Sequence, residues 1–131
     1  IPASEVRMGI DHLTRSLSSL IGTHQEDDLS FNEYLTSLLS TQYRHLHYLK
    51  ALITDRENPP RLTEEMKDLW LVLQWETSNL EFDIDTSRLM GFDQCLHPEE
   101  WTPELLNEVE AGLEQLKLAV NDILSDGHRK S

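Results

Sequence analysis

The segment Met66–Ile84 carries apolar side chains on two opposite sides of one helix, which limits how the chain can pack. At about 100° per residue, Leu71, Trp75 and Phe82 project roughly opposite the main apolar side. That main side consists of Met66, Leu69, Trp70, Leu73, Thr77, Leu80 and Ile84. A helix that is apolar on both sides has to be covered on both sides. We therefore predict that the other helices pack around this one. Its second stripe is either covered by another part of the chain or is a contact surface for a partner, for which it is the best candidate in the sequence.

Periodicity and capping residues predict helices over residues 4–22, 30–56, 63–90 and 102–125. Ser30 with Glu33 forms a capping box, while Thr63 and Thr102 are good N-caps. The end of the third helix is open. A helix continued to Met90 puts Leu89 in line with the second stripe, whereas a break near Glu81–Asp85 leaves a short strand without a partner.

Four helices with connections of short to moderate length predict an all-α fold, an antiparallel (up-down) four-helix bundle. The 131 residues suffice for one domain with a substantial core, so we expect a single helical-bundle domain over 1–131. The chain begins with Ile1, which suggests a fragment of a longer protein.

The charge balance restricts the partners. The chain has 24 acidic and 11 basic side chains, a net charge of −13. A strongly negative field argues against nucleic acid and anionic membrane, because both attract clustered Lys and Arg. It favours a basic protein or peptide as partner.

One cysteine, Cys95, excludes an intramolecular disulfide, and the sequence has no Asn-x-Ser/Thr acceptor. Both features favour an intracellular location, cytoplasmic or nuclear. No apolar run reaches the ~18 residues that a membrane span needs.

No catalytic motif or paired metal-ligand spacing occurs, so we predict a protein that is not an enzyme and has no cofactor. The alternative is a metal-binding or catalytic bundle that uses His45 with inward carboxylates such as Glu76. Gln42 and His45 interrupt the apolar face of the second helix. They either form hydrogen bonds in the core or line a site.

The function that these patterns favour is a protein–protein interaction module of a larger scaffold or regulatory protein. Its partner is another protein, or a second copy in a homodimer, because aromatic side chains are enriched at the centres of interfaces. The predicted contact residues combine the second stripe with acidic side chains of the fourth helix: Leu71, Trp75, Phe82, Leu89, Glu104, Glu108, Glu110 and Glu114.

Overall fold

The computed structural model describes residues 3–18, 29–58, 61, 63–78, 89–91 and 98–129. They form α1 (Ala3–Ser18), α2 (Leu29–Thr54), α3 (Glu64–Ser78), the short 3₁₀ turn η1 (Pro98–Glu100) and α5 (Pro103–Arg129). No strand occurs in these ranges. The predicted all-α helical bundle is therefore confirmed.

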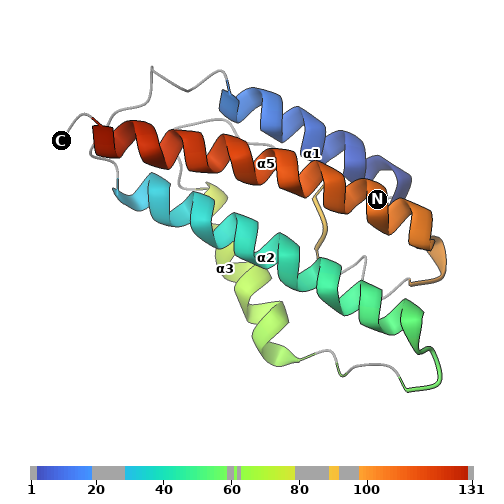
Figure 1. Ribbon diagram of the computed structural model, residues 1–131. Helices are drawn as coiled ribbons and strands as arrows, with labels where there is room; N and C mark the ends of the chain where they lie inside the picture. Colours follow the sequence, from blue (N-terminus) through green and yellow to red (C-terminus); the bar gives the residue numbers. More distant parts are fainter. Residues whose placement is uncertain are drawn as a thin grey trace.

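The helices pack in the order α1, α5, α2, α3 (Figure 1). α2 runs antiparallel to α5, since Tyr43 near its middle bonds to Glu114 and Lys50 near its end pairs with Glu110. α1 and α5 lie side by side and run in the same direction, and the two termini lie at opposite ends of the bundle (Figure 1). Antiparallel alternation around the whole bundle is thus not confirmed.

α2, and not α3, lies between two other helices: it packs against α5 and α3, while α1 packs against α5. Buried residues cover about 140° of its circumference at 100° per residue, and the arc is wide enough to meet α5 at one edge and α3 at the other. These residues are Phe31, Tyr34, Leu35, Leu38, Thr41, Gln42, His45, Leu46, Leu49 and Leu52. In α3 the one fully buried residue is Leu73. The predicted central position of the third helix is wrong, because one apolar side of α3 is left uncovered.

Two predicted helix starts have the expected caps. The hydroxyl of Thr63 accepts a hydrogen bond from the Met66 N–H at 3.2 Å, and the hydroxyl of Thr102 accepts one from the Leu105 N–H at 3.1 Å. Each bond satisfies an amide that the first turn of a helix leaves unpaired. Local sequence therefore fixes where α3 and α5 begin.

Three of the predicted ends need correction. α2 ends at Thr54, because the Asp55 carboxylate accepts the Asn58 N–H at 3.2 Å and turns the chain. α5 continues to Arg129, past the predicted end at 125. The third helix does not reach Met90: α3 ends at Ser78, and Leu89 and Met90 are not helical. Residues 19–22, at the predicted end of the first helix, lie outside the described residues.

The segment 89–91 is bound to α2 by one side chain. The side-chain NH2 group of Gln42 donates to the backbone carbonyl of Met90 at 2.8 Å. The backbone N–H of Met90 donates to the side-chain oxygen of Gln42 at 2.9 Å. Gln42 thus pairs with a buried peptide as a neighbouring strand would, which satisfies two backbone groups that water cannot reach. Of the two roles open to Gln42, hydrogen bonding in the core is the observed one.

Among the described residues, no helix combines the length and the apolar character that a membrane crossing requires.

Candidate functional site

The outer face of α3 is the largest apolar feature exposed on one element in the described structure. It consists of Leu71, Val72 and Trp75, whose spacing of one, three and four residues places them on one side of the helix. Their exposed fractions are 54%, 49% and 69%. Neighbouring apolar side chains that remain half or more exposed mark a candidate contact surface. Val72 was not predicted from the sequence, although it lies next to Leu71 and three residues before Trp75.

The inner face of α3 attaches it to α2 through apolar and polar contacts. Leu73 is fully buried, and Trp70 packs against the core with its ring centroid 5.9 Å from that of His45. The hydroxyls of Thr77 and Tyr34 lie 2.7 Å apart, and burial raises the pKa of Tyr34. Because these contacts hold one side of the helix against α2, the outer face points away from the bundle.

At the other end of α3, Arg44 of α2 pairs with Glu65 at 2.9 Å. Half or more of each side chain is exposed, so this ion pair adds little stability. Together with the Tyr34–Thr77 contact, it shows that α2 and α3 are antiparallel.

The remaining members of the predicted stripe have different positions. Leu89 is buried and belongs to the core, so its predicted place in a contact surface is wrong. It was assigned by extending the helical period of the third predicted helix to residue 89, and Leu89 is not helical. Phe82 lies outside the described residues.

The four predicted acidic residues of α5 separate into two pairs. Glu104 and Glu108 are exposed on the side of α5 that faces solvent. Glu110 is instead ion-paired with Lys50, and Glu114 accepts a 2.7 Å hydrogen bond from the Tyr43 hydroxyl. Burial and this bond to Glu114 raise the pKa of Tyr43. Glu110 and Glu114 thus lie at the edge of α5 beside α2 and connect the two helices, although Glu114 is still exposed.

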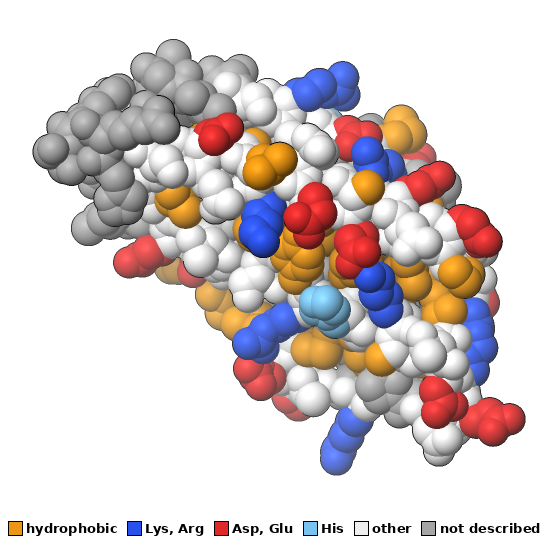
Figure 2. All heavy atoms as spheres, viewed as in Figure 1, with side chains coloured by type: hydrophobic (Ala, Val, Ile, Leu, Met, Phe, Trp, Pro, Cys, Tyr) orange, Lys and Arg blue, Asp and Glu red, His pale blue; other side chains and the backbone are white. Residues whose placement is uncertain are grey.

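The acidic residues of α5 do not form one surface with α3. α2 packs against both helices (Figure 1), and α3 and α5 are not among the helix pairs in closest contact. On the face seen in Figure 2, Lys and Arg side chains also lie among the carboxylates. The negative excess is thus not gathered into one continuous patch on that face.

His45 and Glu76, the pair suggested for a metal or catalytic site, are not brought together. His45 is buried, and its Nδ1 lies 2.8 Å from the Thr41 carbonyl. Glu76 instead acts electrostatically on Tyr34, which lies eleven residues from His45, or about 16 Å along the helix. Within the described ranges, no group of three or more His, Cys, Asp or Glu side chains has an arrangement that could hold a metal ion.

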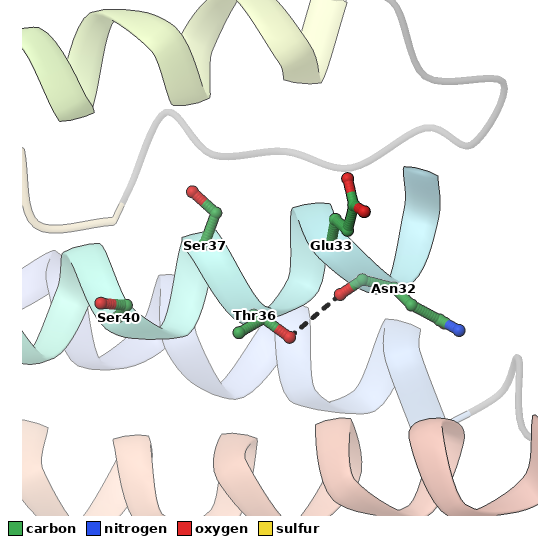
Figure 3. Close-up of a pocket in the computed structure, with 5 residues that line it drawn as sticks. All are labelled: Asn32, Glu33, Thr36, Ser37 and Ser40. Atoms are coloured by element: carbon green, nitrogen blue, oxygen red, sulfur yellow. Dashed lines mark hydrogen bonds between the residues drawn. The ribbon is translucent and has the colours of Figure 1, made fainter. Parts of the chain in front are cut away.

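Described residues line two hollows beside the helices. One of about 450 Å³ lies on the solvent side of α2 and is lined by Asn32, Glu33, Thr36, Ser37 and Ser40 (Figure 3). The hydroxyl of Thr36 donates to the Asn32 carbonyl at 3.1 Å, so it is already engaged by its own helix. The other, of about 320 Å³, lies between the end of α2 and the start of α5. Among the described residues that line them, neither contains the histidine or cysteine that would pair with a hydroxyl in nucleophilic catalysis.

Comparison with known proteins gives no relative from which a function could be transferred. No family model matches the chain, and neither a curated protein nor a solved structure matches it.

Proposed function

We propose that this chain is a non-catalytic protein–protein interaction module that binds a basic, amphipathic helical segment of another protein on the outer face of α3. The observation that carries the proposal is the exposure of Leu71, Val72 and Trp75 on one side of a helix. A partner helix would bury these side chains, and a central tryptophan is a frequent source of binding energy in interfaces.

Charge favours a basic partner over a second copy. Glu64 and Asp68 are exposed and precede Leu71 and Val72 at helical spacing, so they extend the same side of α3 towards its start. Lys67 is also exposed, but at the edge of this side. Each copy has a net charge of −13, which disfavours self-association and accelerates encounter with a positively charged segment.

The proposed setting is an intracellular scaffold or regulatory protein of which this module is one part. The single cysteine, Cys95, and the lack of a glycosylation acceptor support that setting. Binding through a rigid helix face needs no cofactor, so the proposal includes none.

The test is a selection from a display library of helical peptides that vary independently in net charge and in the apolar residues of one face. Selection against the intact chain is expected to enrich peptides with a Lys- or Arg-rich rim around an apolar stripe. The double substitution Leu71→Gln and Trp75→Gln should reduce their affinity at least about 30-fold, since two hot-spot side chains are lost. Glutamine keeps the helix propensity high.

A matched control uses the exposed apolar residues of other helices. Met8 of α1 and Leu118 of α5 are each 58% exposed, so Met8→Gln with Leu118→Gln removes similar chemistry from different faces. Binding should change less than about twofold in this variant. Enrichment of acidic peptides, or equal loss in both double variants, would contradict the proposal. So would light scattering that shows a dimer sensitive to the α3 substitutions.

A further inference from the structure

The ring of His45 lies buried at the junction of α2 and α3 with one nitrogen unpaired. Because the Thr41 carbonyl can only accept a hydrogen bond, Nδ1 of His45 carries the hydrogen. Nε2 is therefore the unprotonated nitrogen, and it has no hydrogen-bond partner among the described residues. The ring is 1% exposed. Protonation of Nε2 in the folded state would place a positive charge and an unsatisfied donor out of reach of water.

The surroundings of His45 are the contacts that attach α3 and the segment 89–91 to α2. Trp70 of α3 meets the His45 ring edge-on, at an interplanar angle of 73°. Trp70 also lies against Gly91, so closely that a Cβ there would come within 2.6 Å of its ring. Gln42, one turn before His45, holds Met90 through two hydrogen bonds. The imidazole thus contacts α3 through Trp70, and Trp70 in turn lies against residue 91.

Charged groups on the surrounding elements are already engaged or lie at the surface. On α2 and α3, Arg44 pairs with Glu65 at the exposed boundary. On α5, Glu110 and Glu114 bond to Lys50 and Tyr43 at the other edge of α2. His47 is exposed and stacks on Tyr43. The segment 89–91 has no titratable side chain. The charged residues of η1 and the start of α1 are exposed or partly exposed: Glu99, Glu100, Arg7 and Asp11.

We propose that His45 makes the α2–α3 junction acid-sensitive: below about pH 6.5, protonation of the ring releases α3 and residues 89–91 from α2 while α1, α2 and α5 stay packed. Opening the junction lets water reach Nε2, and α3 gives up one fully buried side chain, Leu73. The acid sensitivity of the α2–α3 junction goes beyond the proposed partner binding and does not depend on it.

The direction of the pH dependence follows from linkage. Burial lowers the pKa of His45 from its ordinary value of 6.5. The open state, in which the ring is hydrated, therefore binds more protons than the closed state once the pH falls below 6.5. Acid stabilises the open state in that range. Above pH 6.5 the ring is neutral in both states and contributes no pH dependence.

The experiment is hydrogen exchange of the intact chain at pH 7.5 and pH 5.5, followed by mass spectrometry and corrected for intrinsic exchange rates. Protection of the α3 amides, residues 64–78, should fall about tenfold between the two values, while that of the α5 amides stays within about twofold. His45→Leu should reduce the change in α3 to less than about twofold. His45→Gln gives a second non-titrating variant if the leucine variant does not fold.

His47→Gln is the matched control, because it removes an exposed histidine two residues away on the same helix. It should retain the tenfold change. A tenfold loss that persists in both His45 variants would overturn the proposal, as would equal losses in α3 and α5 or unchanged protection of α3.

Discussion

The α1–α5 pair and the α2–α3 pair are held together in different ways. Between α1 and α5 the buried side chains are aliphatic and follow regular stripes: Val6, Ile10, Leu13 and Leu17 from α1, with Val109, Leu113, Leu116 and Val120 from α5. On the buried side of α2, Thr41, Gln42 and His45 are polar, and α3 contributes one fully buried side chain, Leu73. The α1–α5 pair is held by continuous aliphatic packing. The α2–α3 pair instead combines one fully buried side chain of α3 with ring and hydrogen-bond contacts.

The difference explains why the exposed apolar face belongs to α3. Aliphatic packing along a whole helix distributes its stabilisation over many small contacts, so no single change detaches the helix. α3 rests on α2 through Leu73, Trp70, the Tyr34–Thr77 contact and the Arg44–Glu65 pair, and no helix among the described residues covers its other side. A helix attached in this way is the part of the bundle that can open or bind with least disturbance to the rest.

The largest effect is expected from Gln42→Ala. This substitution leaves the N–H and carbonyl of Met90 buried without partners, and each orphaned group costs about 1–3 kcal/mol. The free energy of unfolding, measured by urea denaturation, should fall by about 2–5 kcal/mol. Thr36→Ala on the exposed side of the same helix should change it by less than about 0.5 kcal/mol. A small loss for Gln42→Ala would show that residues 89–91 are not held by this side chain.

Two buried glycines, Gly91 and Gly112, distinguish the two pairs directly. Gly91→Ala places a Cβ about 2.6 Å from the Trp70 ring, so the ring must move. The free energy of unfolding should therefore fall by about 1–3 kcal/mol. In Gly112→Ala on α5, the new Cβ lies 3.2 Å from the Arg7 side chain. The far end of that side chain is flexible and can move away. Alanine stabilises a helix by up to about 1 kcal/mol relative to glycine. The free energy of unfolding of Gly112→Ala should therefore be unchanged or higher. Thermal unfolding of both variants measures this difference in stability. Equal losses of stability would contradict the expected difference between the two pairs.

The smallest effect on stability is expected on the outer face of α3. Leu71→Gln with Trp75→Gln alters side chains that are more than half exposed, so the free energy of unfolding should change by less than about 0.5 kcal/mol. Urea denaturation of the double variant measures it. A loss above about 2 kcal/mol would mean that these side chains are part of the core, and the proposed contact surface would then be wrong.

Local signals in the sequence predicted the helices and several of their starts. Thr63 and Thr102 have the caps that their residue types favour, and the stripes of the first and fourth predicted helices are the buried sides of α1 and α5. Capping depends on residues three positions apart, and a single stripe depends on one period. Both can be derived without knowing the rest of the fold.

Contacts between distant residues could not be derived in this way. The pairing of Gln42 with Met90 joins positions 48 residues apart, and a polar residue on an apolar face does not indicate its partner. Leu89 is buried by tertiary packing, so its agreement with the helical period of α3 was coincidental. Which of the two apolar sides of α3 is covered depends on where α2 lies. For the same reason, Glu110 and Glu114 could not be distinguished from the outward Glu104 and Glu108.

Native-state hydrogen exchange at neutral pH tests most directly whether α3 is the weakly attached helix of this bundle. The amides of residues 64–78 should exchange at least about tenfold faster than those in the middle of α5, through an opening that leaves α5 protected. Equal protection of the two helices, lost together in one global unfolding step, would contradict the account.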